Sequence, residues 1–244
     1  MRIFAISDMH LSIGETDKNM DIFGIKWKNY MDKIKSNWSE ICREDDVVIV
    51  CGDTSWAMDL KNAKSDFEFL NGLPGTKLVL KGNHDYWWNT AVKMNEFVLE
   101  SNFRDIYFLH NNSYSKEQYS ICGTRGWILP EDRKFAVKDK KIYDREINRF
   151  MLSLNDAVSK GKEGSEIIAA FHFPPFSPDG NSDSEFIKIL KEYNVKKCIF
   201  GHIHESNARL NQWKIMAEKL NISSGIEFKP VSADIADFKP QFIY

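Results

Sequence analysis

The stretch Leu80-Lys81-Gly82-Asn83-His84-Asp85-Tyr86 decides how this chain is interpreted. An apolar run from Lys77 to Leu80 precedes it and predicts a buried strand, and Gly82 permits a sharp turn directly afterwards. Asn83 and His84 then offer a neutral oxygen and a ring nitrogen just past the strand end, which is where open α/β sheets bind ligands. Taken alone, this pair is weak evidence for a metal site.

Four further stretches repeat the arrangement of an apolar run, a turn and polar side chains suited to metals. The runs end in Asp8-Met9-His10, Gly52-Asp53, His172 and Gly201-His202-Ile203-His204, and five of the six histidines belong to this pattern. Residues two apart on an extended backbone point the same way, so Asp8 and His10 are predicted to grip one ion together, as are His202 and His204.

A single histidine after a strand is usually a capping or surface residue, and a single Gly-Asp is a turn signal. Five such stretches in one chain instead predict a ligand set of carboxylate, amide and imidazole groups without a thiolate. That set suits two borderline divalent ions such as Mn, Fe, Zn, Co or Ni.

The chain carries, in this order, the motifs D-x-H, G-D, G-N-H-D, a lone His and G-H-x-H. This series resembles the motif series of the calcineurin-like metallophosphoesterases. It runs from Asp8 to His204 and so covers most of the chain. A narrower resemblance, to an uncharacterised bacterial branch of that superfamily, rests on residues 123–127 (GTRGW), 173–176 (FPPF), 231–234 (VSAD) and 237–240 (DFKP).

The resemblance implies a role for each motif residue. The first ion would be held by Asp8, His10 and His204, the second by Asn83, His172 and His202, and Asp53 would bridge them. Two such ions clamp the attacking and leaving oxygens, and a metal-bound hydroxide would attack the phosphate mono- or diester directly. His84 would protonate the leaving oxygen, and the alternative is a histidine that only orients Asn83.

The chain departs from the protein Ser/Thr phosphatases of this superfamily after the second motif. It reads Gly52-Asp53-Thr54-Ser55-Trp56, without the Asp-Arg-Gly that those enzymes carry three residues on. The departure weakens a protein-phosphatase interpretation and leaves Asp85 or Asp59 as the acidic partner of His84. Arg125 is a candidate catalytic residue that clamps phosphate, and the equal alternative is a surface arginine in a turn.

Strands alternating with helices predict an α/β protein, and the resemblance implies a four-layer α-β-β-α sandwich with two stacked mixed sheets in a single domain over 1–244. Two of the strand-like runs, 106–109 and 119–123, are predicted to pair as a hairpin. Helices are predicted at 25–42, 59–69, 91–100, 140–160 and 184–193, and tail strands at 226–228, 230–233 and 241–244.

The composition of the chain limits the compartments and the partners that we expect for it. Hydrophobic residues make up 43% and charged residues 28%, which is ordinary for a globular protein. The net charge of −2 argues against long nucleic acids as partners. No run reaches the 18 apolar residues of a membrane span, so we expect no membrane partner. No signal peptide is visible and no C-x-x-C pair occurs, so we expect a cytoplasmic protein. The oligomeric state is left open.

The leading prediction is a metal-dependent phosphoesterase acting on a small phosphoester, with nucleotides and cyclic nucleotides as candidates. The alternatives are a nuclease or a protein phosphatase of the same superfamily and, less favoured, a non-catalytic scaffold. Aromatic residues cluster near the motifs, and aromatic faces stack on bases. At least one of Trp56, Trp87 and Trp127 is therefore expected to line the cleft, the alternative being that they belong to the hydrophobic core.

Overall fold

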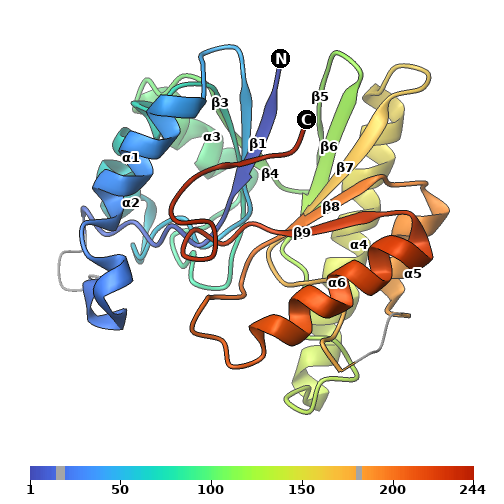
Figure 1. Cartoon of the computed structure of the whole chain (residues 1–244). Helices are drawn as coiled ribbons and strands as arrows, with labels where there is room; N and C mark the ends of the chain where they lie inside the picture. Colours follow the sequence, from blue (N-terminus) through green and yellow to red (C-terminus); the bar gives the residue numbers. More distant parts are fainter. Residues whose placement is uncertain (15–19, 180–182) are drawn as a thin grey trace. The chain divides into compact units, whose positions relative to one another are not determined.

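A computed structural model describes residues 1–14, 20–179 and 183–244, and these form two compact units, each with its own sheet (Figure 1). Unit 1 contains Met1–Phe108 and Val231–Tyr244, and unit 2 contains Leu109–Pro230. The described residues hold two mixed five-stranded sheets and six α-helices. The predicted α/β class and the two sheets are confirmed, and the single domain over 1–244 stays a prediction.

The sheet of unit 1 has the strand order β10-β1-β2-β3-β4. Strands β1, β2 and β3 are parallel, and β10 pairs with β1 in the antiparallel direction. All residues of the three parallel strands are buried, as expected where both faces of a parallel sheet are covered. The bounds are β1 Ile3–Ile6, β2 Val47–Val50, β3 Thr76–Leu80, β4 Ile106–Leu109 and β10 Gln241–Phe242.

Three helices cover one face of this sheet (Figure 1). They are α1 (Tyr30–Ile41), α2 (Leu60–Asn71) and α3 (Ala91–Glu100), preceded by two short 3-10 helices at Met20–Phe23 and Ile25–Trp27. Trp38, Phe67 and Met94 bring the apolar stripes of the three helices into the core. Asp59 and Thr90 cap α2 and α3 by accepting backbone N–H groups three residues on.

The sheet of unit 2 has the order β5-β6-β7-β8-β9, with β5 antiparallel to β6 and the other strands parallel. Its register aligns Thr124, Phe171 and Phe200, so the ends of β6, β7 and β8 lie at one edge. Three helices pack on this sheet around a second core (Figure 1): α4 (Val137–Lys160), α5 (Glu185–Glu192) and α6 (Leu210–Ser224). The strands are β5 Tyr114–Lys116, β6 Tyr119–Thr124, β7 Glu166–Phe171, β8 Lys197–Phe200 and β9 Glu227–Pro230.

Several predicted elements differ from the observed ones. The prediction that 106–109 and 119–123 pair as a hairpin is wrong, because β4 belongs to the sheet of unit 1 whereas β6 pairs with β5 in unit 2. The helix predicted from residue 25 begins as α1 at Tyr30, because Asn29 adopts a left-handed conformation with φ of 55°. Helix α6 was not predicted, although Trp213, Met216 and Leu220 follow helical spacing.

The predicted strand 230–233 is reduced to the last residue of β9 and an isolated bridge of Ser232 with Ser7. Among the described residues, no helix has the length and apolar character needed to span a bilayer.

Candidate metal centre

The loops that follow β1 and β2 are joined by backbone hydrogen bonds beyond the ends of the strands. The amides of Asp8, His10 and Leu11 donate to the carbonyls of Gly52, Asp53 and Thr54 at 2.9, 3.0 and 2.9 Å. The parallel pairing of the two strands therefore continues through the motif residues. This continuation places three predicted ligands, Asp8, His10 and Asp53, beside one another.

These three residues adopt left-handed backbone conformations, with φ of 56° at Asp8, 46° at His10 and 49° at Asp53. In unit 2, His202 has φ of 69°. The prediction that an extended backbone aligns Asp8 with His10 and His202 with His204 is wrong, since the turns are left-handed at these residues. Asp and His tolerate this region better than most side chains, and such strain is concentrated at functional sites.

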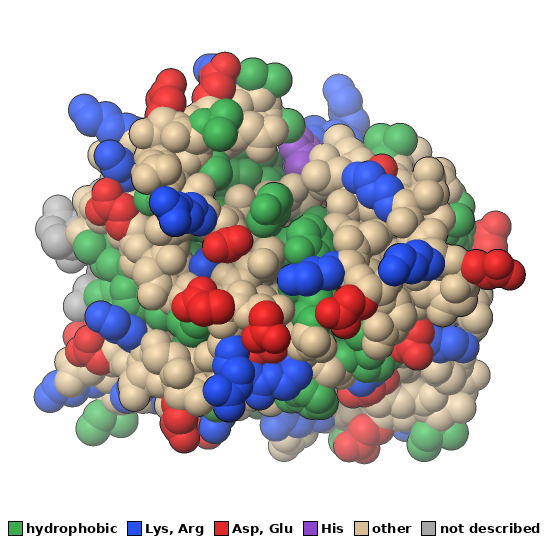
Figure 2. All heavy atoms as spheres, turned by 90° about the horizontal axis from the view of Figure 1, so that it is seen from above, with side chains coloured by type: hydrophobic (Ala, Val, Ile, Leu, Met, Phe, Trp, Pro, Cys, Tyr) green, Lys and Arg blue, Asp and Glu red, His purple; other side chains and the backbone are tan. Residues whose placement is uncertain are grey.

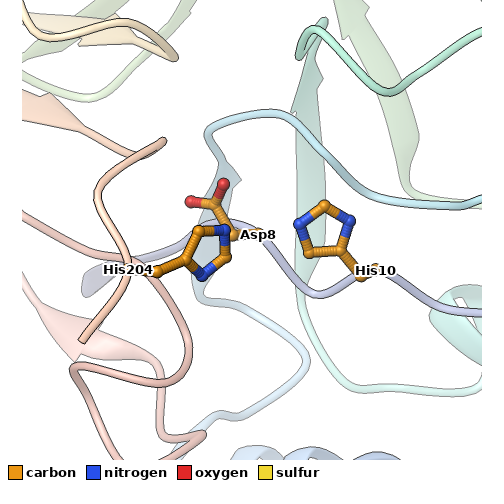
Figure 3. A group of neighbouring side chains, drawn as sticks. All are labelled: Asp8, His10 and His204. Atoms are coloured by element: carbon orange, nitrogen blue, oxygen red, sulfur yellow. The ribbon is translucent and has the colours of Figure 1, made fainter. Parts of the chain in front are cut away.

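The side chains of this group are close enough to share a cation. Ligand atoms of Asp8 lie within 4.8 Å of those of His10 and Asp53, and His10 Nε2 lies 3.8 Å from Asp53 Oδ2. Two atoms bound to one ion at about 2.0–2.2 Å can be at most about 4.4 Å apart, so the last distance fits a shared metal. Figure 3 shows Asp8 and His10, which leave the turn after β1, and His204, which comes from the loop after β8.

The third loop, after β3, approaches Asp53 so closely that it requires glycine. A Cβ on Gly82 would lie 2.0 Å from Asp53 Oδ1 and 2.1 Å from its backbone nitrogen. The approach allows the His84 amide to donate to Asp53 Oδ1 at 2.7 Å, and the Asn83 amide also donates to this carboxylate. The predicted bridging carboxylate is thus fixed by the backbone of the stretch that carries Asn83 and His84.

Asp85 holds the second and third loops together. Its Oδ1 accepts hydrogen bonds from the amides of Thr54 and Ser55 and from Trp87 Nε1, and its Oδ2 accepts one from the amide of Gly82. Sequence reasoning offered Asp85 or Asp59 as the partner of His84. In the structure, Asp85 organises loops, and Asp59 caps α2 by accepting from Asn62 at 2.9 Å.

Trp56 lies against both histidines of unit 1. Its ring is stacked on that of His10, and its centroid is 4.8 Å from the centroid of His84. Trp87 instead is buried beside Phe67 in the hydrophobic core. Of the two tryptophans of this unit that were expected at the cleft, Trp56 therefore contacts predicted functional residues, whereas Trp87 lies in the core.

Buried negative charge makes this group of side chains suited to a cation. Burial, with the neighbouring carboxylates of Asp8 and Asp85, raises the pKa of Asp53 well above its ordinary value. Burial also raises the pKa of Asp85 to about 6, although four N–H donors oppose this shift. A bound divalent ion would reverse the penalty on Asp53 by supplying positive charge. The donors present, carboxylates and imidazoles, fit Mn, Fe, Zn, Co or Ni.

Unit 2 gathers its predicted ligands at one edge of its sheet. His172 directly follows β7, and His202 and His204 follow β8 after Gly201. The rings of His172 and His202 have centroids 5.1 Å apart, and Phe173 packs on His202 at 4.2 Å. His172 is fully buried, while His202 and His204 are half-buried.

Arg125 follows β6 at the same edge, since its carbonyl accepts the Phe173 amide at 2.8 Å. Its guanidinium donates to Glu146 at 3.2 Å and lies 4.5 Å above the ring of Trp127. Arg125 is thus largely buried and held between an acid and an aromatic face, which excludes the interpretation as a simple surface arginine. Sequence reasoning missed Glu146, because nothing near it in the chain marks it as a partner of Arg125.

The motif series agrees with a comparison to known protein families. A sequence model of the calcineurin-like phosphoesterase family matches residues 1–206, so the chain belongs to this family. The two mixed sheets with their helices are consistent with its sandwich fold. The chain is accordingly a metal-dependent phosphoesterase, a hydrolase of phosphoric esters, with candidate metal ligands in place. No curated protein gives a significant match.

Several solved structures resemble the chain. The protein of unknown function AQ665 from Aquifex aeolicus has a TM-score of 0.51 at 17% identity, with 99% of this chain and 95% of that chain covered. TT1561 of Thermus thermophilus has a TM-score of 0.51 at 14% identity, with 82% and 81% covered. Phosphopantetheinyl hydrolase PptH from Mycobacterium tuberculosis has a TM-score of 0.48 at 14% identity, with 84% and 83% covered. At these identities the likeness concerns the fold alone.

Proposed function

We propose that the chain hydrolyses a small phosphate mono- or diester at a centre of two divalent metal ions. One ion would be held by Asp8, His10 and His204, the other by Asn83, His172 and His202, with Asp53 as the bridge. The observation that carries the proposal is the buried group of Asp8, His10 and Asp53, whose spacing and charge call for a cation. Family membership supports the assignment of the other four ligands.

When bound, the ions would supply Lewis acidity and an activated water for attack on phosphorus. The protein would contribute position and a proton. Asp53 is held by N–H groups of the Asn83 and His84 backbone, so the carboxylate is oriented before any ion binds. His84 would donate a proton to the leaving oxygen, and we propose that Arg125 contacts a phosphate group of the substrate.

A small, nucleotide-like ester is favoured over a long polyanion. Basic and acidic side chains are interspersed over the face drawn in Figure 2, whereas a nucleic-acid channel requires a positive stripe. Trp56, packed on His10 and His84, offers an aromatic surface next to the proposed chemistry, on which a base would stack. The four free, buried cysteines suit a reducing cytoplasm, which we propose as the compartment.

Metal content and a substrate panel test this proposal. Metal-free protein reconstituted with Mn or Fe should bind close to two ions per chain by elemental analysis, and Asp53→Asn should lower the affinity at both positions. One ion or none at saturation would refute the binuclear assignment. The panel compares p-nitrophenyl phosphate, bis-p-nitrophenyl phosphate, cyclic nucleotides, dinucleotides, phosphopeptides and single-stranded DNA. Preference for a phosphopeptide or for DNA would favour the protein-phosphatase or nuclease alternative.

A further inference from the structure

Three arginines of unit 2 converge on one buried carboxylate. Arg125, Arg145 and Arg149 place nitrogen atoms 3.2, 3.8 and 2.9 Å from Glu146 Oε1. The other oxygen of Glu146 accepts a hydrogen bond from Thr124 Oγ1 at 2.7 Å. Within the described residues, Glu146 is the sole carboxylate within 4.0 Å of these guanidinium groups, so three positive charges face one negative charge.

This excess positive charge is costly without a further anion. Arg145 and Arg149 are four residues apart on α4 and therefore lie on one face of the helix, where like charges destabilise it. Arg125 is repelled by both, and its side chain is 12% exposed, so water screens this repulsion poorly. Its Nε is buried and makes no hydrogen bond within the part of the chain that the structure describes.

The cluster is accessible and rigid enough to bind an anion. The side chains of Arg145 and Arg149 are 51% and 30% exposed, so a ligand can reach them. Trp127 supports the guanidinium of Arg125 and is itself fixed by its Nε1 hydrogen bond to Asp139 at 3.1 Å. Guanidinium groups held in a fixed orientation are the preferred partners of phosphate oxygens.

The position of the cluster relates it to the proposed substrate. Arg125 and His172 follow adjacent parallel strands, whose backbones lie about 4.8 Å apart. A group bound by the arginines would thus lie at the same sheet edge as the histidines of unit 2.

We propose that Arg125, Arg145 and Arg149 form a binding subsite for a second phosphate group, and hence that the substrate carries a phosphate besides the one that is hydrolysed. This proposal rests on the proposed phosphoesterase function for its substrate, whereas the subsite itself does not require turnover.

A binding experiment without metal tests the subsite directly. Metal-free protein is titrated with inorganic phosphate by isothermal titration calorimetry. The double variant Arg145→Gln/Arg149→Gln should bind phosphate about tenfold more weakly or worse, because two charge-assisted contacts are lost. The matched variant Arg145→Lys/Arg149→Lys should retain more of the affinity than the glutamine pair. Arg104→Gln, which changes an exposed arginine of unit 1, should bind like the wild type.

An activity comparison then tests the substrate class. Adenosine 3′,5′-bisphosphate and adenosine 5′-monophosphate differ by one phosphate. The glutamine pair should reduce kcat/KM for the bisphosphate about tenfold or more and leave the monophosphate nearly unchanged. Absence of phosphate binding by the wild type, equal binding by the glutamine pair, or equal losses on both nucleotides would overturn the proposal. If the wild type turns over neither nucleotide, the phosphate titration alone decides whether the subsite exists.

Discussion

The indole ring of Trp56 is stacked on the imidazole of His10, with centroids 4.6 Å apart and an angle of 23° between the ring planes. Because Trp56 also contacts His84, one aromatic side chain fixes the orientation of a proposed metal ligand and of the proposed acid. Its backbone amide donates to Leu11 at 2.9 Å, so the indole is anchored to the same pair of loops that carries Asp8 and Asp53.

Trp56→Ala should therefore weaken metal binding without unfolding the chain. Groups that orient metal ligands contribute about 10–100-fold to affinity, and we expect a loss in this range, measured by competition with a fluorescent chelator. Trp56→Phe, which keeps an aromatic face, should retain most of the affinity. Unchanged affinity in Trp56→Ala would mean that the backbone of the two loops alone orients His10.

Gly82→Ala should be among the most damaging small substitutions in unit 1. The added Cβ would lie 2.0 Å from Asp53 Oδ1, so the loop after β3 would have to move away and Asp53 would lose the His84 amide. Overpacking of this kind costs about 1–3 kcal/mol. We expect a clear fall in Tm and weaker metal binding, measured by calorimetry with and without Mn.

Gly72→Ala is the matched control for that change. Gly72 ends α2 with φ of −75°, and an added Cβ there would meet its nearest atom at 3.5 Å. Its Tm should remain close to that of the wild type. If the two alanine variants lose equal stability, the close approach at Gly82 does not limit the fold.

The buried lysine near the start of β3, Lys77, should make the stability of the protein depend on pH. Lys77 is 2% exposed, its Nζ donates to the Leu73 carbonyl at 2.8 Å, and burial lowers its pKa. The unfolded chain therefore binds more protons than the folded chain between the lowered pKa and the ordinary value of about 10.4. The free energy of unfolding should consequently gain a positive contribution from Lys77 as the pH rises through this window.

Urea unfolding between about pH 8 and pH 10 measures this contribution as a difference between variants. Lys77→Met should remove the rising component, and Lys64→Met, on the exposed side of α2, should keep the wild-type pH dependence. A parallel pH dependence in Lys77→Met and the wild type would show that Lys77 does not titrate differently on folding.

The sequence was most informative where the chain alternates between buried strands and polar turns. Ligand-type residues after β1, β2, β3, β7 and β8 could be recognised because each follows a continuous apolar run, and parallel strands deliver their ends to one edge. A histidine directly after a strand is not specific to the predicted ligands, since His110 also follows a strand, β4. The order of motifs, rather than any one histidine, identified the family.

Features that depend on contacts distant in sequence could not be predicted. The left-handed turns at Asp8, His10 and Asp53 arise from the backbone pairing of two loops more than forty residues apart. The pairing of Arg125 with Glu146 joins a strand end to the middle of a helix. Strand β4 was assigned to the wrong partner because hairpin signals in the sequence compete with pairing to β3, which is decided by the sheet as a whole.

His84→Ala should separate proton donation from metal binding. The His84 backbone amide, which holds Asp53 at 2.7 Å, is retained in this variant, so metal content should remain that of the wild type. General acid catalysis contributes about 10²–10⁴-fold, and we expect a loss of that order for an alkyl phosphate, whose leaving oxygen needs a proton. The loss should be much smaller for p-nitrophenyl phosphate, because p-nitrophenolate leaves without protonation.

Tyr86→Ala, which removes an exposed ring 6.2 Å from His84, is the matched control and should show no dependence on the leaving group. Equal losses of His84→Ala on both esters, with full metal content, would instead assign His84 a role in positioning the substrate.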